Sequence, residues 1–332
     1  MSLPEYNDIP KWGQLPAEQY LIRHWNPASH ESANQQRARL IQEFLNLDLI
    51  PEELDPTSFG VHPDNRWSRV PTAEEIATIL QPWRSEQIRW RAWKLWQEIR
   101  HPEPPLLRIY YNPKDDERVK SWADMSENYR DVSYWAILDD PDLFDYEGSN
   151  SSWLQVFNIL PELSRTVRGY SRINIDESVR GEFFHRGRAD VKEALDYVKR
   201  DHPDWRNDPS ILITDNYPAT SLLHSISSTR ILIADKETFE TGQLLYVHLD
   251  AKQNITMQGR IDLTLERLDQ IAGDEIQAEM PEDVWEEGSV GEGYKMGGKP
   301  GQELFQWTKQ DLEDDPAPEV SAVEDGVSRL DV

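Results

Sequence analysis

Three short apolar runs in the last third of the chain decide its fold: Ser210-Ile-Leu-Ile-Thr214, Arg230-Ile-Leu-Ile-Ala234 and Gln243-Leu-Leu-Tyr-Val-His-Leu249. Runs of this length, rich in Ile and Leu, are typical of strands buried on both faces of a sheet. Segments with turn or helical character separate them, and such alternation favours at least partly parallel pairing with right-handed crossovers. The sequence therefore predicts an α/β or α+β fold.

The N-terminal half carries helical signals. Apolar positions recur at helical spacing over Ser32–Leu47, and Thr72-Ala-Glu-Glu75 has the pattern of a capping box, which starts a helix. A further helix is expected from Ser85 to about Arg100, where a Trp-rich stripe recurs at three- and four-residue steps: Ile88, Trp93, Trp96 and Ile99. We expect this stripe to be core, and expect basic residues nearby to lie mostly off it: Arg84, Arg91 and Lys94.

Shorter signals fill the rest of this half. Residues 1–30 are expected to form an extended arm, Leu106–Tyr111 and Val132–Leu138 to be strands, and Trp153–Leu160 and Ala189–Arg200 to be helices.

The pattern predicts one main folded body with two extensions. A helix-rich region with a few strands covers residues 1–205, and a small α/β unit, which belongs to the same body, covers 206–275. A Gly-rich loop that docks on the body follows over 276–308, and a disordered acidic tail over 309–332. Residues 274–332 hold 17 acidic and 4 basic residues, the composition of a solvated segment.

Composition excludes several classes of protein. The chain has 332 residues and no cysteine, so it has no disulfide and no thiolate site. It has no apolar stretch of about 20 residues and no signal-peptide pattern at its start, so we expect a cytoplasmic or nuclear location rather than a membrane or secreted one. The net charge of -26 makes nucleic acid an unlikely partner and allows a basic protein partner.

The most unusual local cluster is Arg180-Gly-Glu-Phe-Phe-His185-Arg186-Gly-Arg188. Arginine donates a planar pair of hydrogen bonds, so Arg180, His185, Arg186 and Arg188 are candidate ligands for a carboxylate or phosphate. The alternative is that this basic segment pairs with the protein's own carboxylates.

Two carboxylates follow predicted strands. Asp215 and Asp235 come directly after the first two apolar runs, and ligands of open α/β sheets bind at the carboxyl ends of strands. The competing interpretation, which we favour, is that each Asp caps the helix or turn that follows it.

Other motifs are incomplete. Gly293-Tyr-Lys-Met-Gly-Gly298-Lys299-Pro300 approaches a phosphate-binding loop, but Pro300 stands where the motif needs a hydroxyl. The eight histidines form no zinc-binding pair, so neither a metal nor a cofactor is predicted.

Residues 210–275 resemble a family of microbial domains of unknown function. The resemblance is carried by SILITDNY, RILIADKETF and QLLYVHLDAKQNITMQGRIDL. It implies no activity and transfers no catalytic residue.

The sequence favours a non-catalytic interaction or accessory protein with a protein partner. The alternative is an enzyme or binder for a small phosphate-bearing ligand, which would use the arginine cluster and the strand-end carboxylates. A third option is a nucleic-acid mimic whose acidic surface occupies basic sites.

Overall fold

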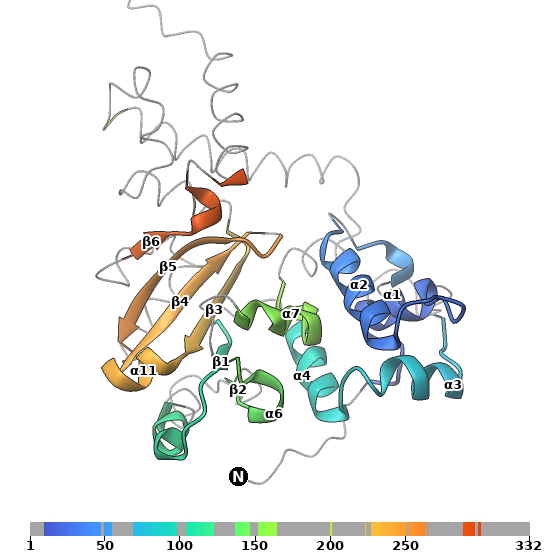
Figure 1. Ribbon diagram of the computed structural model, residues 1–332, viewed down its shortest axis with the longest axis horizontal. Coiled ribbons are helices and arrows are strands. Elements are labelled where there is room, and N and C mark those ends of the chain that lie inside the picture. Colours follow the sequence, from blue (N-terminus) through green and yellow to red (C-terminus); the bar gives the residue numbers. More distant parts are fainter. Residues whose placement is uncertain are drawn as a thin grey trace, which may run out of the picture.

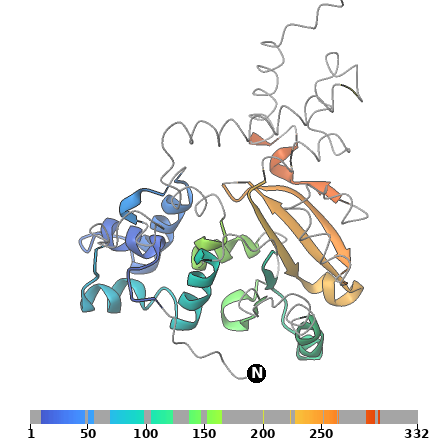
Figure 2. The same ribbon diagram turned by 180° about the vertical axis from the view of Figure 1, so that it is seen from behind.

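The computed structural model describes residues 10–47, 50–54, 69–97, 104–122, 137–146, 152–164, 227–250, 252–262 and 288–295, with Arg200, Leu223, Thr264, Gly298 and Lys299. The fold is α/β: a helical layer packs on one face of a mixed six-stranded sheet (Figures 1 and 2). In these residues no helix is long and apolar enough to cross a bilayer.

The helical layer comes from the first half of the chain. Its α-helices are α1 (Pro16–His24), α2 (Ala33–Leu45), α3 (Ala73–Glu75), α4 (Glu86–Gln97), α6 (Pro141–Phe144) and α7 (Val156–Ile159). Between them lie the π-helical turn η2 (Ile76–Leu80) and 3-10 turns: η1 (Glu52–Leu54), η3 (Pro113–Asp115), η5 (Ser152–Gln155) and η6 (Pro161–Leu163). Residues 116–122 are also helical.

Capping boxes start two of these helices, and the one at Thr72 was predicted from the sequence. The Ser32 hydroxyl accepts the Gln35 N–H at the start of α2, and Thr72 accepts the Glu75 N–H at the start of α3. In both helices the side chain of the third helical residue, Gln35 or Glu75, accepts the backbone N–H of the capping residue. Two backbone donors that would otherwise be free are thus satisfied. The expectation of an extended N-terminal arm is wrong for residues 16–24, which form α1 with seven of its nine residues buried.

The sheet has the strand order β2-β1-β3-β4-β5-β6. Its strands are β1 (Leu106–Arg108), β2 (Ile137–Leu138), β3 (Thr229–Ala234), β4 (Gln243–Leu249), β5 (Ile255–Asp262) and β6 (Gly288–Val290). β1 pairs in parallel with both β2 and β3, whereas β3 to β6 form an antiparallel meander.

The expectation of partly parallel pairing can be compared with the structure only for the second and third apolar runs, because Ser210–Thr214 lies outside the described residues. The apolar runs that become β3 and β4 are antiparallel, because only the six-residue helix α11 (Lys236–Thr241) separates them. A parallel crossover needs about a dozen residues or more. Gly242, at φ +93°, ends α11 in the left-handed conformation and lets β4 begin at the next residue. The parallel partner that the structure gives to β3 is β1, from the N-terminal half.

Within the Gly-rich segment the structure describes residues 288–295, with Gly298 and Lys299. These residues supply the edge strand β6 and the turn η10 (Glu292–Tyr294), where the sequence predicted no regular element. A Cβ on Gly291 would lie 1.9 Å from the Ile255 carbonyl oxygen, so only glycine fits this approach. Tyr294 is buried, and its hydroxyl donates to Asp250 over 2.6 Å.

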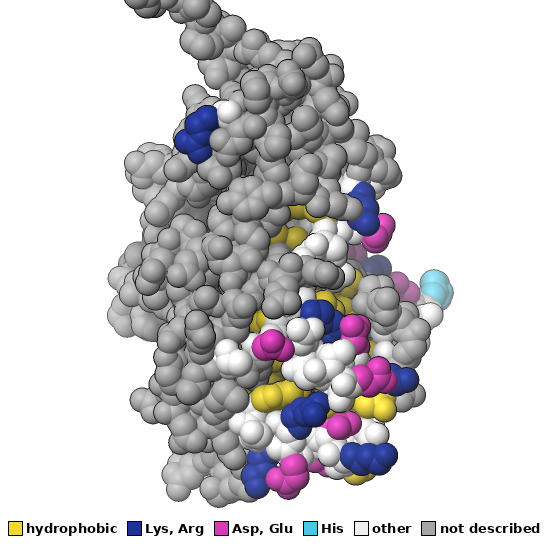
Figure 3. All heavy atoms as spheres, turned by 90° about the vertical axis from the view of Figure 1, so that its left-hand side faces the viewer, with side chains coloured by type: hydrophobic (Ala, Val, Ile, Leu, Met, Phe, Trp, Pro, Cys, Tyr) yellow, Lys and Arg dark blue, Asp and Glu magenta, His cyan; other side chains and the backbone are white. Residues whose placement is uncertain are grey.

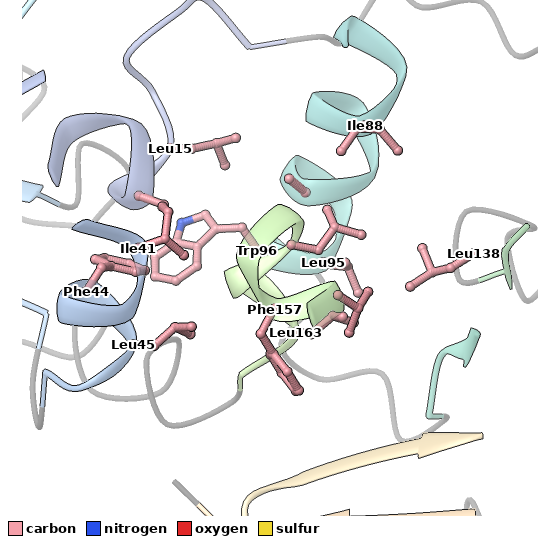
Figure 4. Packing of buried hydrophobic residues seen from close by; sticks show 14 of the residues in the cluster. Leu15, Ile41, Phe44, Leu45, Ile88, Leu95, Trp96, Leu138, Phe157 and Leu163 are labelled. Carbon is pink, nitrogen blue, oxygen red and sulfur yellow. The ribbon is translucent and has the colours of Figure 1, made fainter. Parts of the chain in front are cut away.

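One hydrophobic core joins the helices to the sheet. Trp96 of α4 is fully buried and reaches toward Ile41 and Phe44 of α2 (Figure 4). The same cluster continues through α7 to alternate residues of the sheet, including Ile231 and Ile233. Trp96 is core as predicted, whereas Trp93 is only partly buried at the margin of the cluster.

The expectation that Arg84 lies off the core face is wrong. Its side chain is 0% exposed and forms a double hydrogen bond with Glu162, at 2.8 and 3.0 Å. Next to it, Arg89 pairs with Glu18 of α1 over 2.6 Å. These buried ion pairs connect α1 to α4 and η6 to the residues just before α4, and no local spacing rule predicts them.

Candidate functional site

The three parallel strands end at the same edge of the sheet. In register, Arg108 of β1 lies beside Ala234 of β3, and Leu107 lies beside Leu138 of β2. From β1 the chain goes to one neighbour, β2, and then crosses back to the other side of β1 to form β3. Connections that diverge in this way open a crevice at the carboxyl ends of strands, where open α/β sheets bind ligands. This edge is the candidate site.

Arg108 organises the edge. Its side chain is 4% exposed, and its Nε donates to the Tyr110 carbonyl over 3.0 Å. One terminal nitrogen, Nη2, lies 2.8 Å from Asp116 Oδ1, and the other, Nη1, lies 3.5 Å from Asp139 Oδ1. Asp116 begins the helical residues 116–122, and Asp139 directly follows β2. One guanidinium thus joins two carboxylates from separate segments.

Aromatic rings enclose the same guanidinium. Its central carbon lies 4.6 Å from the ring centroid of Tyr111 and 5.6 Å from that of Phe239 on α11. Phe239 also contacts the rings of Tyr110, at 6.0 Å, and Trp122, at 5.8 Å. We call six residues from these segments the strand-end cluster: Arg108, Tyr110, Tyr111, Asp116, Asp139 and Phe239.

Burial sets the electrostatics of the strand-end cluster. Burial raises the pKa of Asp139, and the negative charge of Asp116 adds to this, although Arg108 and Arg91 favour the carboxylate. Burial also raises the pKa of Tyr111, with further contributions from the charges of Asp139 and Asp140. Arg108 and Arg91 thus oppose the effects of burial and of the Asp116 charge on the pKa of Asp139.

Asp235, predicted from the sequence as a strand-end carboxylate, has a structural role at the same edge. Its Oδ1 accepts the Thr238 N–H at the start of α11, and Arg260 pairs with both of its oxygens, at 2.8 and 2.5 Å. Burial raises the pKa of Asp235, but the bonds from Arg260 and Thr238 outweigh it and hold the pKa below its usual value. The capping interpretation thus describes what this side chain does here.

The other predicted site residues lie outside the described residues: Arg180, His185, Arg186, Arg188 and Asp215. Of the segment that approaches a phosphate-binding loop, Gly293 lies in η10, and a Cβ on Gly298 would lie 2.1 Å from the Gly293 carbonyl oxygen. These glycines therefore pack the chain against itself.

Sequence reasoning missed most of the strand-end cluster. Asp139 directly follows an apolar run, and so do Asp215 and Asp235 in the sequence, so the rule applied to those two residues would also have selected it. No sequence rule selects Arg108, because a single arginine within an apolar run is expected to be a solvent-exposed position of a strand. Its burial depends on Phe239, which is 131 positions away along the chain.

A second polar group lies on the sheet face that does not contribute to the shared core. Arg230 of β3 is in register with His248 of β4, and the His248 ring contacts the Tyr246 ring edge-on at 4.6 Å. All three residues are buried, and the Tyr246 hydroxyl is 3.5 Å from Arg230 Nη1.

The described residues contain no group of three or more His, Asp or Glu side chains placed to hold a metal ion. Comparison with protein-family models, curated proteins and solved structures finds no match to this chain. The resemblance of residues 210–275 to a family of unknown function therefore transfers no site residue, and functional inference rests on the geometry.

Proposed function

We propose that this chain is a non-catalytic interaction protein that binds a basic segment of a partner protein at the strand-end cluster. The observation that carries the proposal is that two accessible carboxylates at this edge share a single buried guanidinium. Asp116 and Asp139, with side chains 63% and 34% exposed, share one buried arginine, so a cation from outside would complete their pairing. Partial burial makes such a charge–charge contact stronger than one on an open surface.

The aromatic residues favour a protein partner over a free ion. Tyr110, Tyr111 and Phe239 are partly exposed around Arg108, and aromatic residues with arginine are enriched at the energetically dominant centres of protein interfaces. On the face of the molecule shown in Figure 3, acidic and basic side chains are intermixed over the described part. On this face, pairing with particular side chains would therefore orient the partner.

The test uses a fluorescent hexa-lysine peptide and the full chain, with binding followed by anisotropy at an ionic strength of about 0.15 M, where the Debye length is about 8 Å. We expect Asp116→Asn to weaken binding severalfold. The control is Glu240→Gln, which removes the same charge from an exposed position on α11 outside the cluster. Equal losses in the two variants would mean that net charge alone attracts the peptide, and the proposal would be abandoned.

The second candidate is a small anionic ligand, because Arg108 lies where open α/β sheets hold phosphates. Phosphate would have to displace the Asp116 carboxylate from Nη2 and would lie beside the Asp139 carboxylate, which repels it. A melting temperature that rises with phosphate in the natural chain, but not in Arg108→Lys, would favour this candidate over the basic partner.

A further inference from the structure

The two carboxylates of the strand-end cluster are spaced by a guanidinium. Asp116 Oδ1 and Asp139 Oδ1 face the two terminal nitrogens of Arg108, at 2.8 and 3.5 Å. Because a guanidinium is planar and rigid, the two carboxylates are each held at one end of the same flat group. The Arg108 side chain is 4% exposed, whereas the two Asp side chains are accessible, so a partner group can approach the carboxylates from solvent.

The aromatic rings beside the two carboxylates are suited to contact with a planar cation. Tyr110 and Phe239 form a tilted aromatic pair that is partly exposed. Arginine stacks on aromatic faces more often than lysine does, because its delocalised cation is planar and weakly hydrated. This chain already uses the contact repeatedly, with arginines over the rings of Trp12, Trp25, Trp83 and Tyr111.

We infer that the partner contributes an arginine side chain, whose guanidinium bridges Asp116 and Asp139 beside the rings of Tyr110 and Phe239. The inference rests on the proposed function and specifies its ligand. A lysine ammonium is a compact point charge, so it satisfies one carboxylate well but cannot span both in a plane. The site should therefore distinguish two peptides of equal charge.

The experiment compares labelled hexa-arginine and hexa-lysine peptides on the full chain at the same ionic strength. We expect the hexa-arginine Kd to be lower by about fivefold, the ratio that one exposed cation–π contact supplies. Phe239→Leu keeps an apolar side chain but removes the ring, so it should lower the ratio toward one while hexa-lysine binding persists. Asp116→Asn should lower the ratio as well, and Glu240→Gln should leave it unchanged.

The outcomes separate the two proposals. If both peptides bind equally and Asp116→Asn weakens both, the basic partner stands and the arginine specificity is wrong. If neither peptide binds the natural chain, both proposals fall. If the arginine preference survives both Asp116→Asn and Phe239→Leu, the preference arises elsewhere and the inference is overturned. Because Asp116 is largely exposed, its variant should fold even where a change at the more buried Asp139 does not.

Discussion

At the scale of single residues, the buried charged side chains are the positions where we expect substitution to cost the most stability. Glu18 and Arg89 are at most 1% exposed, and Glu18 accepts hydrogen bonds from Arg89 and from the Gly13 N–H. The guanidinium of Arg89 lies 3.6 Å from the Trp12 ring centroid and also donates to the Pro10 carbonyl. Every partner is supplied by the fold, so removing one leaves a charge in a site that water does not reach.

Glu18→Gln should lower the free energy of unfolding by about 3–5 kcal/mol, because it leaves the buried Arg89 and Arg84 without their shared carboxylate. Denaturant titration measures the change. Glu240→Gln, at an exposed ion pair with Lys236, should show no measurable change under the same conditions. Similar stabilities for the two variants would contradict the structural role assigned to the buried pair.

Trp96→Ala should destabilise the fold by about 3–5 kcal/mol, because it removes a fully buried indole from the centre of the core. Trp93→Ala should cost clearly less, since Trp93 is only partly buried at the margin of the same cluster. Thermal or chemical unfolding of the two variants tests the order. A larger loss for Trp93 would show that it, and not Trp96, occupies the central position.

The pKa of Asp235 predicts a pH dependence. Burial opposes ionisation, but Arg260 and Thr238 hold the folded pKa below the ordinary 3.8, so the ionised form stabilises the fold. This contribution is present above the unfolded pKa and is lost as pH falls through the folded pKa. Asp235→Asn keeps a capping side chain. It should therefore be less stable than the natural chain at neutral pH, and the gap should close below about pH 4. A gap that does not change with pH would refute the electrostatic origin.

At the scale of elements, turn chemistry determines the order in which strands pair. α11 begins at the Asp235 cap, ends at Gly242 and is too short to carry the chain across the sheet, so β4 returns antiparallel to β3. At the other edge, β6 depends on a glycine that touches the backbone of β5. Gly242 is required for its left-handed backbone angle, whereas Gly291 is required because a side chain there would collide with the backbone of β5.

Alanine substitutions at Gly291 and Gly242 distinguish the roles of these two glycines. Gly291→Ala should displace β6, because its Cβ would lie 1.9 Å from the Ile255 carbonyl oxygen, and the β5 amides beside β6 should then exchange faster with solvent. Gly242→Ala meets no atom within 4 Å, so its cost should be only the left-handed strain of about 1–2 kcal/mol, without local opening at β6. Hydrogen exchange read peptide by peptide distinguishes them, and protection of β5 that survives Gly291→Ala would contradict the assignment.

At the scale of the whole molecule, one core unites helices and sheet, whereas half of the net charge lies in the last 59 residues. Leu107 and Leu138 from the N-terminal half share the core cluster with Val247 and Leu249. Folding therefore requires contacts between segments more than 100 residues apart. Such non-local pairing slows folding and makes cooperative unfolding of the body the expected behaviour.

Deleting residues 310–332 should shift the melting temperature by no more than about two degrees, because the segment is acidic and nearly free of large apolar side chains. Its structure lies outside the described residues, so this prediction rests on composition. The deletion also removes repulsive charge, and any small shift should be upward at low salt. Loss of soluble expression would instead show that the segment docks on the body.

The sequence by itself determined the features that depend on a few neighbouring residues. The capping boxes at Ser32 and Thr72, the helix that places Trp96 in the core, and the strands of the RILIA and QLLYVHL runs follow from side chains within about four positions of one another. The α/β class followed from their alternation. Each of these elements carries its signal in neighbouring residues, either a capping pattern, an apolar periodicity or a continuous apolar run, so local pattern is enough to predict it.

Only the tertiary structure decided which segments meet. The pairing of Leu106 with Leu232, the antiparallel return of β4, the burial of Arg84 against Glu162 and the stacking of Arg108 on Phe239 all join residues far apart or depend on the length of a connection. The local sequence around an arginine does not show whether its side chain lies in solvent or is buried against a carboxylate. A buried arginine differs from an exposed one in its desolvation energy, which arises only when the folded chain surrounds the side chain. The strand-end cluster could therefore be found from the structure but not from the sequence.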